Sequence, residues 1–175
     1  MPIRIRYLLA LTLVLSLSVS VTAQEITRES LGSPGPYQVA YYSSYPAVPE
    51  FSAATIYFPA NKGEDFPGVA ISPGFVESQE NMSWWGNHLA SHGFAVLTLD
   101  TNELRDNPSL RADALMAAIE VLRNEGERMG GTLRGKILND RMAIMGHSMG
   151  GGGTLIAANA HTMNASKEAS GSLPL

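Results

Sequence analysis

The sequence predicts an α/β protein in which a mostly parallel β-sheet is covered by helices on both faces. Two observations indicate this class. From residue 68 onward, short apolar segments alternate with segments of helical periodicity. The apolar segments are continuous, which is typical of strands that are buried on both faces, as in a parallel sheet. Strands that alternate with helices form parallel sheets with right-handed crossovers.

Two earlier segments are expected to form an antiparallel pair of strands that leads into this sheet. Residues 37–42 and 54–58 are rich in aromatic and β-branched side chains, and a polar turn follows the second segment. The main sheet then receives strands at residues 68–72, 94–99 and 141–145. The helices that follow these strands are expected at residues 83–92, 108–124 and 149–160.

Glycine and proline mark the ends of these helices. Gly93 follows the first helix and Pro108 opens the second, as is usual at these positions. The second helix also carries an apolar stripe at steps of three and four residues, made of Leu110, Ala114, Leu115, Ala118, Ile119 and Leu122. The loop after this helix is marked by Gly126, Gly130, Gly131 and Gly135. No regular element is expected in the small, polar residues 164–175.

The N-terminal segment is predicted to be a signal peptide, residues 1–23. Arg4 and Arg6 precede an apolar run, and small residues end at Ala23, where a signal peptidase cleaves. The run is short for a membrane span, and an uncleaved anchor is the alternative. We then expect an N-terminal arm at residues 24–36 and one domain at residues 37–175, periplasmic or secreted and not in the membrane after cleavage.

Composition excludes several classes of partner and site. Without Arg4 and Arg6 the chain holds 10 basic and 16 acidic residues, a net charge of −6. This acidic balance gives nucleic acid no cationic surface to bind. The chain has no cysteine, so it has no disulfide, no thiolate nucleophile and no cysteine-based zinc site. Neither a metal nor a cofactor is predicted, and the oligomeric state is not indicated.

The chemical signal is the sequence Gly146-His147-Ser148-Met149-Gly150, a G-x-S-x-G motif between a predicted strand and a predicted helix. This context is typical of a nucleophile elbow, a sharp turn that lifts the serine hydroxyl out of the sheet. The following helix places amide donors near the site, where they stabilise the oxyanion formed when serine attacks an acyl carbon. Ser148 is therefore the predicted nucleophile. The alternative is a glycine-rich turn without a catalytic role.

An oxyanion hole requires a second amide, and the loop after the first parallel strand supplies a candidate. We expect the Phe75 and Met149 amides to form the hole and the Phe75 ring to form one wall of the acyl site. The alternative is an ordinary Pro-Gly turn with Phe75 in the core.

Other prominent side chains are assigned to packing or to the walls of the site. His147 adjoins the nucleophile but points away from it on a sharp turn, so we expect it to line the substrate cleft and not to act as the base. His88 and His92 are expected at the surface or in packing. Trp84 and Trp85 are expected in core packing, in preference to a substrate platform.

Two long segments of the chain are SPGFVESQENMSWWGNHLASHGFAVLTLDTN and RMAIMGHSMGGGGTL. They resemble the bacterial polyester hydrolases, which include cutinases and poly(ethylene terephthalate) hydrolases, and the resemblance covers about residues 35–160. It implies an α/β-hydrolase fold with a shallow open cleft, hydrolysis of ester or polyester substrates, and a Ser-His-Asp triad.

By this resemblance Ser148 is the nucleophile, and Phe75 and Met149 supply the oxyanion amides. His147 stands where cutinases have histidine and the poly(ethylene terephthalate) specialist has tryptophan. Asp106 and Arg111 match a stretch that we interpret as structural.

The remainder of the triad does not appear after Ser148. In this fold an acid and then a histidine follow the serine, but here His161 precedes Glu168. His161 also lies about 20 Å along the helix from Ser148, at 1.5 Å per residue. We therefore expect a domain truncated after the elbow helix, with the triad Asp and His absent from this chain and little activity in the chain alone. The alternative is an inactive fragment or remnant binding module.

Overall fold

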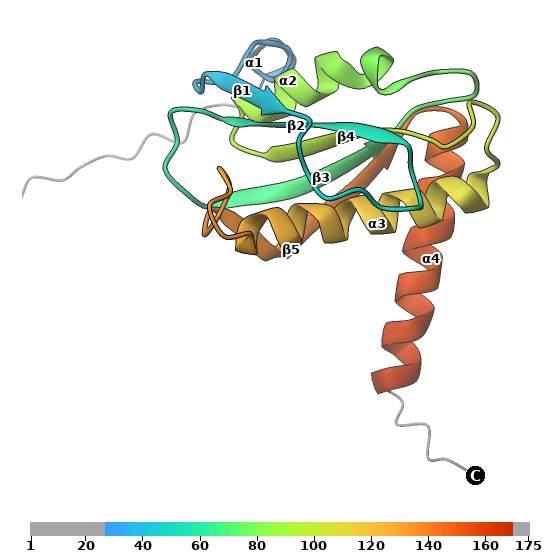
Figure 1. Ribbon diagram of the computed structural model, residues 1–175. Helices are drawn as coiled ribbons and strands as arrows, with labels where there is room; N and C mark the ends of the chain where they lie inside the picture. Colours follow the sequence, from blue (N-terminus) through green and yellow to red (C-terminus); the bar gives the residue numbers. More distant parts are fainter. Residues whose placement is uncertain (1–26, 170–175) are drawn as a thin grey trace, which may run out of the picture. The chain divides into compact units, whose positions relative to one another are not determined.

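The computed structural model describes residues 27–169, with side chains as far as Thr162 (Figure 1). The predicted signal peptide lies outside the described residues. Residues up to Gly32 form one unit and residues from Ser33 form another. The described part of the first unit is the short helix α1 (Arg28–Gly32), within the segment where an arm or loop was expected. Its start is capped by hydrogen bonds between Thr27 and Ser30: the Ser30 N–H donates to Thr27 Oγ1 at 3.0 Å.

The second unit is built on a five-stranded sheet with the order β1-β2-β4-β3-β5. β2 pairs antiparallel with both β1 and β4, whereas β3 pairs parallel with both β4 and β5. The predicted antiparallel pair and the predicted parallel sheet are both confirmed. The strands are β1 (Val39–Tyr42), β2 (Ala53–Pro59), β3 (Phe66–Ser72), β4 (Ala95–Asp100) and β5 (Ile137–Gly146).

Helices cover both faces of this sheet, as predicted. The reason is the strand order: β4 lies on one side of β3, and the next strand, β5, lies on the other side. From β3 the chain moves outward to β4 through α2 (Ser83–Ser91), which the 3₁₀ helix η1 (Gln79–Met82) precedes. From β4 it returns across β3 to β5 through α3 (Pro108–Glu127). Right-handed crossovers in opposite directions place their helices on opposite faces (Figure 1). The last helix, α4 (Met149–Ala169), packs against α3 and β5.

Two helix ends differ from the prediction. α3 continues through Gly126, which we had assigned to a loop. A Cβ at that position would lie 2.9 Å from the Ile137 Cβ, so glycine serves the close packing of α3 on β5. α4 continues to Ala169, into residues for which no element was expected. Ala165, Lys167, Glu168 and Ala169 in this segment are residue types with high helix propensity.

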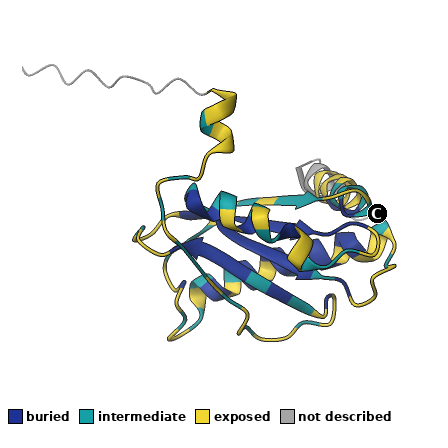
Figure 2. Ribbon diagram, turned by 90° about the horizontal axis from the view of Figure 1, so that it is seen from above, coloured by how far each residue is buried: buried dark blue, intermediate teal, exposed yellow. Residues whose placement is uncertain are grey.

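The apolar core has two layers because successive strand residues point to opposite faces. Leu97 of β4 packs with Leu115 and Leu122 on the α3 side. Its neighbour Val96 packs with Ala90 on the α2 side. Figure 2 shows the buried residues concentrated in the strands and on the helix faces turned toward them. The central strands are therefore shared by both layers.

One core assignment was wrong. Trp84 is 58% exposed, whereas Trp85 packs against the layer on the α2 side. Adjacent helical residues are separated by about 100° around the axis, so they do not both face the sheet. The two rings still touch, with centroids 4.2 Å apart. Among the described helices, none has both the length and the apolarity needed to cross a membrane.

Candidate active site

The candidate site lies at the C-terminal ends of two neighbouring parallel strands. The register of β3 and β5 pairs Ser72 with Gly146, and the His147 N–H donates to the Ser72 carbonyl at 3.1 Å. The loop after β3 and the turn after β5 are therefore adjacent. The chain leaves β3 toward the α2 face and leaves β5 toward α4, which packs against α3. Ligand sites in α/β sheets form where adjacent connections diverge in this way.

The G-x-S-x-G segment forms a tight strand-to-helix turn. Ser148 is exposed and has a φ of 50°, a left-handed conformation that is uncommon for residues other than glycine. A Cβ at Gly146 would lie 2.1 Å from the Gly150 carbonyl carbon, and a Cβ at Gly150 would lie 2.4 Å from the Ser72 oxygen. Both glycines therefore allow a close approach of backbone segments that a side chain would prevent. The Gly150 N–H closes the turn by donating to the His147 carbonyl at 2.7 Å.

The loop after β3 presents Phe75 at the surface. Its side chain is 51% exposed, so the alternative of a core phenylalanine is wrong. In the described part of the chain, neither the Phe75 N–H nor the Met149 N–H donates to a protein acceptor. Val76 follows with a φ of 60°, and its N–H donates to the Leu104 carbonyl at 2.9 Å. The backbone of this loop is thus held by a hydrogen bond at Val76, and the Phe75 N–H is available to a ligand.

His147 is exposed and makes a contact that local sequence patterns did not reveal. Its Nδ1 lies 2.8 Å from Glu77 Oε2, which also accepts from the Gly74 N–H at 2.7 Å. The bond to His147 and the bond from Gly74 lower the pKa of Glu77. Because the carboxylate accepts, Nδ1 carries the proton in this pair. Glu77 thereby links the elbow to the loop that carries Phe75.

Arg111 is a second residue whose connection to the site the sequence did not indicate. It is fully buried at 0% exposure. Its guanidinium donates to the carbonyls of Asp106 (2.8 Å), Pro73 (2.9 Å) and Leu104 (3.1 Å). Burial lowers the pKa of Arg111, and the carboxylates of Asp106 and Glu77 oppose this effect.

The Ser148 hydroxyl has no hydrogen-bond partner among the described histidines. Within this part of the chain, the Ser148 hydroxyl makes no hydrogen bond to another side chain. His161 lies farther along α4 and lines a hollow together with Ile144 of β5 and Arg123 of α3. His88 and His92 pack against each other with ring centroids 4.7 Å apart, in keeping with a surface or packing role. No group of three acidic or histidine side chains in the described residues is suited to hold a metal ion.

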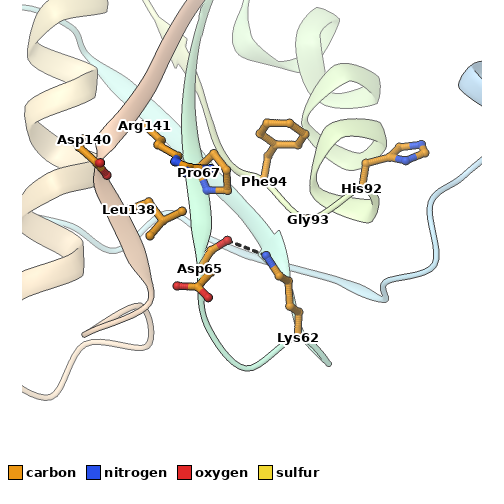
Figure 3. Close-up of a pocket in the computed structure, with 9 residues that line it drawn as sticks. All are labelled: Lys62, Asp65, Pro67, His92, Gly93, Phe94, Leu138, Asp140 and Arg141. Carbon is orange, nitrogen blue, oxygen red and sulfur yellow. Dashed lines mark hydrogen bonds between the residues drawn. The ribbon is translucent and has the colours of Figure 1, made fainter. Parts of the chain in front are cut away.

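A separate hollow of about 450 Å³ lies at the opposite end of the sheet (Figure 3). Lys62, Pro67, Phe94 and Arg141 are among the residues that line it. The Lys62 ammonium donates to the Asp65 carbonyl at 2.6 Å, as the dashed line in Figure 3 marks. This hollow adjoins the N-terminal ends of the parallel strands, away from Ser148, and we assign it no ligand.

Comparison with known proteins agrees with the resemblance seen in the sequence. A family described as PET hydrolase-like matches residues 24–170. Bis(hydroxyethyl) terephthalate hydrolase of Streptomyces coelicolor is 45% identical over 126 residues, which cover 71% of this chain and 39% of that protein. Cutinase 2 of Thermobifida cellulosilytica is 44% identical over 109 residues, 62% of this chain and 40% of that protein. Cutinase 1 of the same organism is 41% identical over 128 residues, 73% of this chain and 47% of that protein. The chain thus spans less than half the length of these relatives.

Proposed function

Because the chain belongs to the PET hydrolase-like family, we propose that it is part of a serine carboxylic-ester hydrolase of the cutinase, lipase or polyester hydrolase type. One observation carries the proposal. Ser148 is exposed in a left-handed conformation at the start of α4, and the Phe75-bearing loop lies beside it. Strained backbone of this kind is concentrated at functional sites, where the surrounding structure maintains it.

The proposed reaction is an acyl transfer through Ser148. Its oxygen bonds to the acyl carbon, and the carbonyl oxygen becomes an oxyanion that accepts from the Phe75 and Met149 amides. The ester C–O bond then breaks, and the alcohol departs with the proton that the Ser148 hydroxyl gave up. A water oxygen bonds to the acyl carbon of the acyl-enzyme, the bond from Ser148 to that carbon breaks and releases the acid, and a proton of the water restores the Ser148 hydroxyl. We propose that the base, a histidine oriented by an aspartate, lies outside this chain.

The walls of the proposed site come from Phe75 and His147. The Phe75 ring contacts the acyl part of the substrate, and the exposed His147 lines the cleft beside the nucleophile. One relative is named for the hydrolysis of bis(hydroxyethyl) terephthalate and others are named cutinases. These names support small esters and polyesters as the substrate class. We also propose export through residues 1–23, to the periplasm or the medium.

Labelling with a fluorophosphonate probe tests the proposal, because the probe reacts only with an activated serine. The full product of the reading frame that contains this chain should be labelled and should hydrolyse a p-nitrophenyl ester. Ser148→Ala should abolish both signals. Ser109→Ala, at an exposed serine near the start of α3, is the matched control and should change neither.

The alternative function is a remnant binding module that retains the cleft without the triad. It predicts that the unmodified full product is not labelled, although it is folded by circular dichroism. Undiminished hydrolysis by Ser148→Ala would refute the assigned nucleophile.

A further inference from the structure

Both ends of the backbone that surrounds Phe75 are connected to one buried side chain. On one side, the Pro73 carbonyl accepts from Arg111 Nη1 at 2.9 Å. On the other side, the Val76 N–H donates to the Leu104 carbonyl at 2.9 Å, and that same carbonyl accepts from Arg111 Nη2 at 3.1 Å. The Phe75 N–H lies between these two fixed points.

Arg111 is also packed directly beneath the helix that follows the nucleophile. A Cβ at Gly153 of α4 would lie only 2.9 Å from the Arg111 Cβ. The guanidinium itself makes its hydrogen bonds to backbone carbonyls of two loops, 73–76 and 104–106. The two elements that carry the proposed oxyanion amides therefore both rest on Arg111.

Packing alone gives a poor explanation of this arrangement. Burying a charge is costly, and an apolar residue of similar volume often serves a core equally well or better. A guanidinium, in contrast, has donors in a rigid planar fork that fixes the directions of its acceptors. Three carbonyls that accept from one such fork have little freedom to rotate. The peptide that carries the Phe75 N–H is close to them in the chain, so its rotation is restricted as well.

Val76 supplies independent evidence that the loop is held in place. It is β-branched and has a φ of 60°, a conformation that is a genuine outlier for such residues. Strain of this kind persists only where the surroundings over-determine the backbone. The Leu104 carbonyl, fixed by Arg111, provides the hydrogen bond to the Val76 N–H.

We propose that Arg111 is the positioning residue of the oxyanion hole: it fixes the direction of the Phe75 N–H through Pro73 and Leu104. It touches neither substrate nor nucleophile. The proposal rests on the function proposed above and adds to it the residue that organises the hole in advance of the reaction. Preorganised donors stabilise developing charge because they need no rearrangement at the moment of reaction.

The first experiment compares Arg111→Lys with Arg123→Lys in the full product of the reading frame. Both residues are on α3, but Arg123 pairs with Glu120 at the surface. Lysine retains the charge and loses the planar fork. We expect Arg111→Lys to lower kcat on the order of 10- to 100-fold with little change in KM, because a displaced donor affects mainly the transition state. Fluorophosphonate labelling should slow in parallel, and Arg123→Lys should match the unmodified protein.

A second pair of variants leaves Arg111 in place, in case Arg111→Lys does not fold. Gly153→Ala adds a methyl group against the Arg111 Cβ, whereas at Gly152 the nearest atoms, in Pro108, are 3.4 Å from the added carbon. Both changes raise helix propensity equally. We expect Gly153→Ala to lower kcat and labelling more than Gly152→Ala does, at equal fractions of folded protein.

The outcomes separate the two proposals. If Ser148→Ala abolishes activity while Arg111→Lys and Gly153→Ala retain full kcat and labelling rate, Arg111 is structural and the inference is wrong. If Ser148→Ala retains activity, the proposed function itself is wrong. A rise in KM without a loss of kcat in Arg111→Lys and Gly153→Ala would also overturn the positioning role. Such a result indicates the loss of an interaction that binds substrate and transition state equally.

Discussion

Ser148 has a left-handed backbone conformation that is maintained by the residues around it. The turn is closed by hydrogen bonds from Gly150 to His147 and from His147 to Ser72. Gly146 and Gly150 permit the strand, the turn and the start of α4 to approach within distances that no side chain tolerates. The backbone geometry of Ser148, the proposed nucleophile, therefore depends on its neighbours as much as on the serine itself.

Gly150→Ala tests this argument. Its methyl group would lie 2.4 Å from the Ser72 carbonyl oxygen, so backbone must move. We expect the free energy of unfolding to fall by about 1–3 kcal/mol, the usual cost of overpacking, measured by urea denaturation. Gly63→Ala is the control, since nothing lies within 4 Å of the added carbon. Similar losses in both variants would show that close approach is not the cause.

Glu77 gives the site a pH dependence with a defined sign. Its bonds to His147 and Gly74 lower its pKa from the ordinary 4.5. The ionised Glu77 carboxylate therefore stabilises the folded state. This contribution is fully present above the ordinary pKa and is lost as the pH falls through the lowered pKa of the folded state. We expect the unmodified protein to have a higher Tm than Glu77→Gln near neutral pH, and the difference to shrink in acid. Glu64→Gln, at an exposed loop position, is the control. Parallel Tm curves for Glu77→Gln and the unmodified protein would contradict the assignment.

The sequence predicted the residues of the candidate site whose signals are local. Ser148 and Met149 follow from a motif in its strand-to-helix context, and Phe75 follows from its place after the first parallel strand. Glu77 and Arg111 did not follow. Glu77 meets His147 across 70 residues, and Arg111 meets Pro73 across 38. Pairings of this range depend on strand order and register, which periodicity does not encode.

Among the elements, α3 connects the site to the opposite side of the domain. Its first turn begins at Asn107, whose side chain accepts from the Ser109 and Leu110 amides at 2.9 and 3.1 Å. Its last turn carries the buried Glu125, which accepts from Arg128 and from the Tyr42 hydroxyl of β1. Burial and the neighbouring Glu125 raise the pKa of Tyr42. Both ends of the helix that carries Arg111 are thereby fixed.

Asn107→Ala removes the cap of this helix. We expect a loss of about 0.5–2 kcal/mol in the free energy of unfolding, because two amides at the start of α3 lose their acceptor. Asn107→Asp should retain the stability, since aspartate caps equally well and its charge favours a helix N-terminus. Chemical denaturation measures both variants. Equal destabilisation by alanine and aspartate would exclude the cap as the source of the effect.

At the same scale, the sequence predicted the type and order of the elements better than their ends. Buried strands and amphipathic helices have strong periodic signals, and each of them is present. Helix ends depend on tertiary contacts instead: Gly126 remains helical because α3 packs closely on Ile137. Strand β5 begins at Ile137, earlier than the apolar segment 141–145. Its first residues pair with β3 through a bulge between Pro67 and Gly68, which no local pattern reveals.

For the whole molecule, the decisive feature is a sheet whose central strands serve two core layers at once. Val96 and Leu97 are adjacent in β4 and fully buried, yet they face α2 and α3 respectively. The proposed oxyanion loop leaves this sheet from β3 and rests on Arg111 of α3, whereas α2 packs on the other face. Neither face can loosen without disturbing strands on which the other depends, so we expect the domain from Ser33 onward to unfold as one cooperative unit.

Leu115→Ala tests this cooperativity, because Leu115 lies on one face of the sheet and the tryptophans lie on the helix that covers the other face. Leu115 is fully buried on the α3 side, and truncation of a buried leucine costs about 2–5 kcal/mol. Both tryptophans of the chain, Trp84 and Trp85, are on α2. A cooperative domain requires that tryptophan fluorescence and far-ultraviolet circular dichroism shift together to a lower urea midpoint. Leu155→Ala, at a position 74% exposed, should leave both midpoints nearly unchanged. If circular dichroism shifted while fluorescence did not, the two layers would be independent, and Arg111 would organise the proposed oxyanion hole from the α3 side alone.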